Sequence, residues 1–119
     1  MDKLLQFIRE KNPTVPIYVL GIYNPFYLNF PDLADIHGVV DMWNQVTETT
    51  VTAYPGVYFV PINDRLSKGL DQAISKPGGP LNDLLSEEDS FHPNLTGYEI
   101  MKQAVMESIR ETKQDWPNQ

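Results

Sequence analysis

The residues with the clearest chemical potential lie together near the carboxyl end of the chain. Asp89 and His92 are three residues apart, and Pro93 follows the histidine directly. Because Pro93 disfavours the α region for His92, the histidine should be extended in a turn. Asp89 can then accept a hydrogen bond from one imidazole nitrogen and leave the other free as a base. The pattern predicts a proton-transfer pair, although an acidic loop at a helix start would be a plainer interpretation.

A second group of candidate residues lies in a loop expected from residue 23 to residue 31. Tyr23, Asn24, Phe26 and Tyr27 are candidate substrate-binding residues, because open α/β sheets bind ligands beyond the carboxyl ends of their strands. Packing of these aromatic side chains within the protein is an equal alternative. A non-catalytic α/β interaction module that binds a partner through loop 23–30 is the competing function.

Neither a metal nor a cofactor is predicted. The chain contains no cysteine, which excludes disulfides and thiolate zinc ligands. His37 stands beside Asp35 on a predicted helix. We expect His37 at the protein surface rather than in a metal site with Asp89 and His92.

The predicted elements would carry both groups of residues to one edge of a parallel sheet. Residues 17–22 and 57–62 are apolar, β-branched runs typical of strands covered on both faces. Helical spacing predicts helices up to about residue 11, over residues 33–52 and from Thr96 onward. Asp32 is the expected N-cap of the second helix, and Thr96 with Glu99 has the form of a capping box. The intervening segment 63–89 should hold short helical turns and a mobile loop near residues 76–80.

Composition places the chain among globular proteins. Hydrophobic residues make up 41% of the 119 residues and charged residues 21%, so residues 1–119 are expected to form a single domain. The net charge of -7, with dispersed basic residues, argues against a nucleic-acid partner. No apolar run approaches the length of a membrane span, so the chain as written is expected to be soluble. A secretion leader or membrane anchor on a longer parent protein would not be visible here.

Residues 89–98 read Asp-x-x-His-Pro-Asn-x-x-Gly-Tyr. This segment resembles the last motif of SGNH/GDSL-type lipases and acylhydrolases, and residues 17–26 resemble the fourth strand and following loop of bacterial members. The resemblance implies an α/β fold, namely a partial flavodoxin-like SGNH hydrolase fold with three α/β/α layers and parallel strands. It also implies hydrolysis of an acyl ester, with His92 as general base and acid and Asp89 as its orienting partner.

The chain departs from the family pattern in its other motifs. The Gly-Asp-Ser nucleophile motif and the glycine and asparagine of the oxyanion hole have no counterpart. Asn63-Asp64 imitates a family Gly-x-Asn-Asp motif without the glycine and is predicted to be a strand-end turn. Ser90 has no strand-to-helix elbow to aim it and is expected to be an exposed turn residue. We therefore expect the C-terminal half of a hydrolase domain, inactive alone, whose nucleophile lies in a missing N-terminal part.

Two predicted strands cannot make a finished sheet. Both of their outer edges would present unpaired peptide groups, and their apolar faces would need cover. We expect the missing N-terminal half or a symmetric homodimer to cover these edges.

Overall fold

The computed structural model describes residues 1–29, 31–33, 35–70 and 82–117. The elements are, in chain order, α1 (Asp2–Lys11), β1 (Ile17–Leu20), α2 (Phe26–Asn29), η1 (Pro31–Leu33), α3 (Asp35–Thr52), β2 (Val57–Val60), α4 (Asn63–Leu66), α5 (Leu95–Thr112) and η3 (Lys113–Asp115). The predicted loop near residues 76–80 lies outside the described residues.

The two strands form a parallel pair, as predicted for a βαβ unit. Ile17 lies opposite Val57, and Leu20 lies opposite Val60. Both strands end two residues earlier than predicted. Pro61 has no N–H to give to a ladder, and the side chain of Asn44 takes up the N–H and the C=O of Ile22, each at 2.9 Å.

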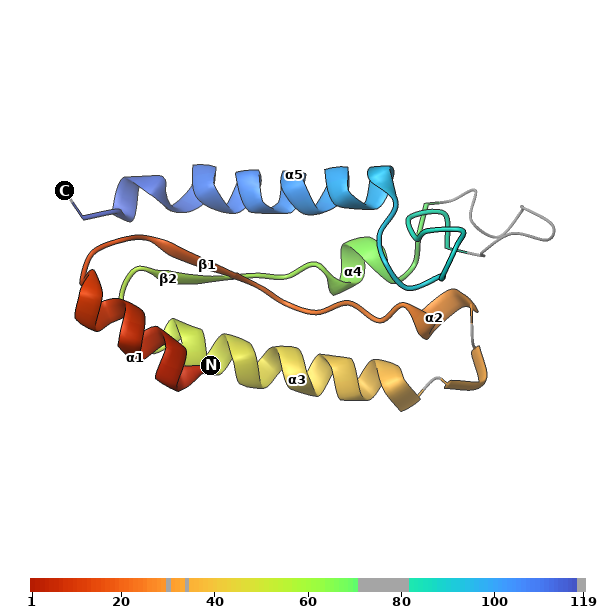
Figure 1. The fold of residues 1–119 in the computed structure, drawn as a ribbon, viewed down its shortest axis with the longest axis horizontal. Helices are drawn as coiled ribbons and strands as arrows, with labels where there is room; N and C mark the ends of the chain where they lie inside the picture. Colours follow the sequence, from red (N-terminus) through yellow and green to blue (C-terminus); the bar gives the residue numbers. More distant parts are fainter. Residues whose placement is uncertain (30, 34, 71–81, 118–119) are drawn as a thin grey trace.

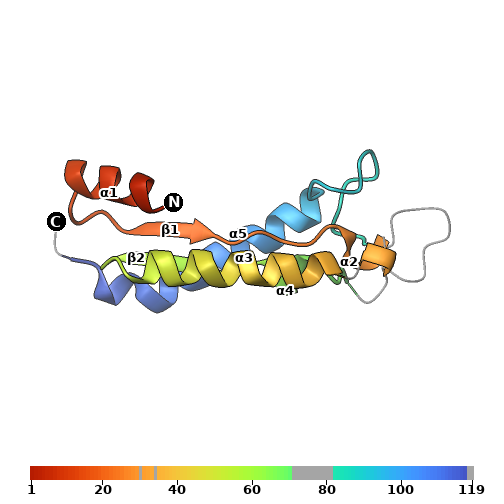
Figure 2. The same cartoon turned by 90° about the horizontal axis from the view of Figure 1, so that it is seen from below.

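Helices cover both faces of this pair. Figure 1 shows α5 on one side of the strands and α1 with α3 on the other, and Figure 2 shows the α1 and α3 side. The three-layer α/β/α prediction is therefore confirmed. Strand β1 is only half-buried, and 37% of Leu20 is exposed. No strand of the described chain pairs with the second edge of β1, so that edge is open, as expected for two strands.

The apolar core has two parts, one on each side of the strands. The part beneath α5 is larger and contains five buried residues, namely Val60, Ile62, Leu66, Leu84 and Ala104. The part between the strands, α1 and α3 contains Leu5, Val51 and Val57. No helix among the described residues is long and apolar enough to cross a membrane.

Three predicted boundaries are wrong in detail. Segment 23–31 was expected to be irregular, but it contains the helical turn α2 and the start of η1. Helix α3 begins at Asp35, and Asp32 lies inside η1 rather than at the N-cap of α3. Leu33, which helical spacing had assigned to the start of this helix, belongs instead to η1, which begins with Pro31.

The last helix begins two residues earlier than the capping-box pattern predicts. Its N-cap is Asn94, whose Oδ1 accepts from the N–H of Gly97 at 2.9 Å, so Thr96 lies inside the helix. The amide Nδ2 of Asn94 also donates to the carbonyl of Asp83 at 2.7 Å and to that of Leu85 at 3.2 Å. Asn94 can satisfy backbone groups on both sides of the helix start, which a threonine hydroxyl at position 96 could not reach.

Candidate active site

Asp89 organises the turn that carries His92. Its Oδ1 accepts from the backbone N–H of Phe91 at 2.9 Å and from that of His92 at 3.1 Å. Its Oδ2 lies 2.5 Å from the imidazole Nδ1 of His92. The predicted contact between the two side chains is thus present, and the backbone bonds hold the carboxylate in the orientation that makes it. The catalytic role of the pair stays a prediction.

The charge state of Asp89 follows from these contacts. The hydrogen bond from the His92 side chain, followed by those from the N–H groups of Phe91 and His92, lowers the pKa of Asp89 from 3.8 to about 2. Asp89 is therefore a carboxylate throughout the neutral range. An ionised carboxylate beside Nδ1 favours the tautomer that has its proton on Nδ1. In that tautomer the other ring nitrogen, Nε2, can accept a proton.

The His92 side chain is 76% exposed, and its Nε2 has no hydrogen-bond partner among the described residues. His92 lines a hollow of about 370 Å³ at the end of the strands. The other lining residues come mainly from the end of β1 and the segment that follows it, with one residue from α5, namely Leu20, Gly21, Ile22, Tyr23, Pro25, Ile62, Phe91 and Met101. A base is therefore open to a largely apolar groove.

The aromatic loop supports the histidine turn. The hydroxyl of Tyr23 donates to the carbonyl of Phe91 at 2.6 Å, and the ring of Phe26 meets that of Phe91 edge to face at 5.1 Å. Burial, and then the neighbouring Tyr98 and Asp89, raise the pKa of Tyr23, so the phenol keeps the proton that it donates. Tyr23 and Phe26 thus pack on the residue before His92, while the substrate-binding role predicted for the loop stays a prediction.

A glycine fixes how closely α5 approaches this turn. A Cβ on Gly97 would lie 2.4 Å from the carbonyl oxygen of Leu84 and 2.9 Å from the Cβ of Pro93. Pro93 also forms an isolated bridge with Leu85. The Asn-x-x-Gly spacing after His92 therefore anchors the turn to the helix start, in addition to capping the helix.

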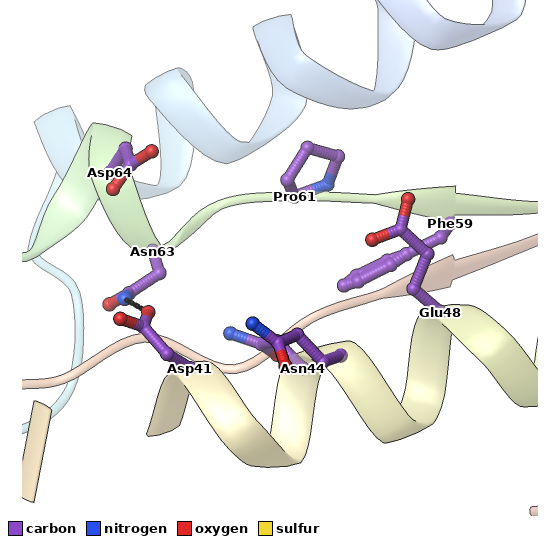
Figure 3. A pocket seen from close by; sticks show the side chains of 8 residues that line it. Asp41, Asn44, Glu48, Phe59, Pro61, Asn63 and Asp64 are labelled. Carbon is purple, nitrogen blue, oxygen red and sulfur yellow. Dashed lines mark hydrogen bonds between the residues drawn. The ribbon is translucent and has the colours of Figure 1, made fainter. Parts of the chain in front are cut away.

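Sequence reasoning missed a buried amide network beside this site. Asn24 is fully buried, and its backbone N–H donates to Asn63 Oδ1 at 2.8 Å. Asn63 Nδ2 in turn donates to Asp41 at 3.3 Å, as Figure 3 shows. Each asparagine follows one of the two strands, so the signal was a polar residue of the same type after each apolar run. Asn63 is thus more than the strand-end turn residue that was predicted.

His37 belongs to the same network and is not the surface residue that was predicted. Its side chain is 24% exposed, and Nδ1 lies 3.4 Å from the Nδ2 of Asn24. The ring of Tyr27 is 4.8 Å from the imidazole. No group of three or more metal-ligating side chains occurs in the part of the chain that the structure describes.

Ser90 lies inside the histidine turn and does not follow a strand. Its φ of 59° is positive, and its N–H donates to the carbonyl of Ser86 at 2.9 Å. The residue is half-buried rather than exposed as predicted. Its backbone bond places it in a tight turn, which a left-handed conformation makes possible.

Comparison with known proteins gives two matches. The family model of the GDSL-like lipase/acylhydrolase family matches residues 1–100. The uncharacterized protein YpmR of Bacillus subtilis (strain 168) is 31% identical over 110 residues, which are 92% of this chain and 39% of the relative. The chain thus spans about two fifths of the length of that relative.

Proposed function

The chain belongs to the GDSL-like lipase/acylhydrolase family, and from this premise we propose that it supplies the histidine and aspartate of a serine-type ester hydrolase. His92 acts as general base and acid, and Asp89 orients and stabilises its imidazole. The nucleophilic serine and the oxyanion donors belong to the part of the hydrolase domain that these 119 residues do not contain.

One observation carries the proposal. Asp89 Oδ2 is 2.5 Å from Nδ1 of His92, while Nε2 is open to the groove at the strand ends. A surface ion pair alone would not need the two further backbone bonds to Asp89, which fix the carboxylate and the imidazole relative to each other. Such a fixed pair supports a general-base role for Nε2 toward a group in the groove.

The reaction follows from this arrangement. The serine oxygen attacks the ester carbonyl while Nε2 of His92 takes the serine proton, and the Asp89 carboxylate stabilises the resulting imidazolium. His92 then gives that proton to the departing alcohol, which leaves an acyl-serine. Water attacks the acyl-serine with its proton passing to Nε2, and the proton returns to the serine as the carboxylic acid is released.

The groove favours a substrate whose acyl group carries a hydrocarbon segment. Leu20, Ile22 and Met101 line it beside His92, and these side chains can bury a hydrocarbon segment.

The test uses a chimera in which this chain replaces the matched segment of the Bacillus relative. We expect the chimera to hydrolyse short p-nitrophenyl esters and His92→Ala to lower kcat/KM by about 10⁴-fold or more. Asp89→Asn should lower it strongly as well. Glu88→Gln, at the exposed neighbouring position, is the matched control and should change little.

The 119-residue chain alone should show no hydrolysis above background, because it has no Gly-Asp-Ser motif. Turnover by the chain alone that disappears in Ser90→Ala would identify Ser90 as a nucleophile and contradict the proposal. If the chimera still hydrolysed esters after His92→Ala, that result would also contradict the proposal.

A further inference from the structure

The peptide unit between Phe91 and His92 is bound at both of its polar ends. Its N–H, which belongs to His92, donates to Asp89 Oδ1 at 3.1 Å. Its carbonyl, which belongs to Phe91, accepts from the hydroxyl of Tyr23 at 2.6 Å. Because the N–H and C=O of a trans peptide point in opposite directions, the two bonds together resist rotation of the peptide plane. The Cα of His92 lies in that plane, so the direction of its imidazole depends on Tyr23 as well as on Asp89.

The two hydrogen bonds come from different parts of the chain. Asp89 belongs to the turn itself, whereas Tyr23 is 68 positions away from Phe91 along the chain. The turn has little burial of its own, because 44% of Phe91 and 76% of the His92 side chain are exposed. A bond within the turn holds Asp89 and His92 together but does not place them relative to the strands. The Tyr23 hydroxyl instead joins the turn to the segment that follows β1.

The backbone on each side of Tyr23 is itself fixed. The side chain of Asn44 binds the N–H and the C=O of Ile22, each at 2.9 Å. Asn63 Oδ1 accepts from the backbone N–H of Asn24 at 2.8 Å, and 6% of Asn63 and none of Asn24 is exposed. Breaking a buried bond of this kind is costly, because it leaves a polar group without a partner. Helix α3 and the start of α4 therefore hold the residue whose hydroxyl reaches the histidine turn.

Tyr23 acts in this contact as a hydrogen-bond donor. Burial, and then Tyr98 and Asp89, raise the pKa of its phenol above the ordinary value of 10, so the proton stays on the oxygen at neutral pH. That one proton is directed at the Phe91 carbonyl. The ring of Tyr23 also lines the groove beside His92, and a phenylalanine at this position would keep the ring while removing the bond.

We propose that Tyr23 is a positioning residue, whose hydroxyl fixes the direction in which His92 presents Nε2 to the groove. The effect on catalysis rests on the proposed function of His92, whereas the effect on orientation does not. Loss of the hydroxyl should lower kcat, because His92 then spends less time in the productive direction, and a misplacement of about 1 Å can cost about 10²-fold in rate. KM should stay the same, because the lining of the groove is kept.

The first measurement uses the 119-residue chain and needs no substrate. In Tyr23→Phe, the NMR order parameter of the His92 backbone N–H should fall from the range of rigid backbone, about 0.85, toward about 0.6. Tyr18→Phe is the matched control. It also removes one hydroxyl, which bonds to Thr112 Oγ1 at 2.6 Å and accepts from the indole of Trp116 at 2.9 Å. This control should lower the free energy of unfolding and leave the His92 order parameter unchanged.

The second measurement uses the chimera with the Bacillus relative. Tyr23→Phe should lower its kcat about tenfold with KM unchanged, and Tyr18→Phe should change neither. In a chimera that already carries His92→Ala, adding Tyr23→Phe should lower the residual rate no further, because the group that Tyr23 positions is gone.

Four results would overturn the inference. An unchanged His92 order parameter in Tyr23→Phe, or an equal fall in Tyr18→Phe, would show that the hydroxyl does not position His92 in particular. A raised KM with unchanged kcat would assign the hydroxyl to substrate binding. A further loss in the His92→Ala chimera would show that Tyr23 acts without the imidazole. If the order parameter falls as expected but the chimera hydrolyses no ester, the proposed function is contradicted and the positioning of His92 by Tyr23 stands.

Discussion

Helices α3 and α5 have the same length, 18 residues, and lie on opposite sides of the strand pair. On α5, Ala104 is buried and Ile100, Met101 and Val105 pack against the larger core. On α3, Val40 and Val51 are buried while an apolar stripe from Val39 to Val46 faces solvent. The apolar face of α5 is thus packed against the core, whereas the apolar stripe of α3 is not covered by any described residue.

This difference between α3 and α5 shows that the formation of a helix and the burial of its apolar face have separate causes. Both helices satisfy their own backbone hydrogen bonds, so both can form. Stability, however, comes mainly from the apolar area that each helix removes from water. We therefore expect the α5 side to dominate the stability of the isolated chain, and four predictions test that expectation.

The largest effect is expected from a lysine placed on each helix in turn. Ala104 is 3% exposed, so Ala104→Lys should lower the free energy of unfolding by about 3 kcal/mol or more through overpacking and a buried charge. Met42→Lys should change it by no more than about 0.5 kcal/mol. Urea unfolding followed by circular dichroism measures both. Equal destabilisation by the two variants would show that α3 is as well packed as α5.

The next effect concerns the side chains that fix each helix to the rest of the chain. Asn94→Ala removes the cap of α5 and two bonds to segment 83–85, and should cost about 2 kcal/mol. Asn44→Ala removes the two bonds from α3 to Ile22 and should cost about 1 kcal/mol. The same urea experiment ranks them, and a larger loss for Asn44→Ala would reverse the comparison.

A smaller effect is expected from the ion pair between α4 and α5. Arg65 Nη2 lies 2.5 Å from Glu107 Oε2, and both side chains are more than a third exposed. Arg65→Gln should therefore lower the urea midpoint by less than Asn94→Ala does. The loss caused by Arg65→Gln should disappear in high salt. A loss that persists in high salt would mean that the pair contributes through packing.

The smallest effect is local and depends on pH. Asp89 has a folded-state pKa of about 2 against an ordinary value of 3.8, so its contribution is complete above about pH 4 and is lost as the pH falls through about 2. The backbone amide signals of Phe91 and His92 should move over that range in an NMR titration. Asp89→Ala should remove this response. Movement at pH 5 to 6 instead would contradict the hydrogen bonds assigned to the carboxylate.

The sequence predicted the parts of the site that depend on local spacing. The Asp89–His92 contact follows from three residues and a proline, and the parallel strand pair follows from two apolar runs. The amide network of Asn24 and Asn63 joins residues 39 positions apart and could not be derived from spacing. It needs the register of the two strands, which only the folded chain supplies.

The same limit applies to α3. Val39, Val40 and Trp43 fall at helical spacing, but the structure buries Val40 and exposes the other two. The helix is apolar on more than one side, so periodicity alone cannot decide which side meets the strands.

The two hydrogen bonds between Asn44 and Ile22 also bear on aggregation. An exposed strand edge can recruit copies of itself into growing assemblies, and the risk increases with the number of free peptide groups in a row. Because the amide of Asn44 already occupies the N–H and C=O of Ile22, the free edge of β1 ends after Leu20. The chain thus offers a very short template for fibril growth, which should slow its aggregation.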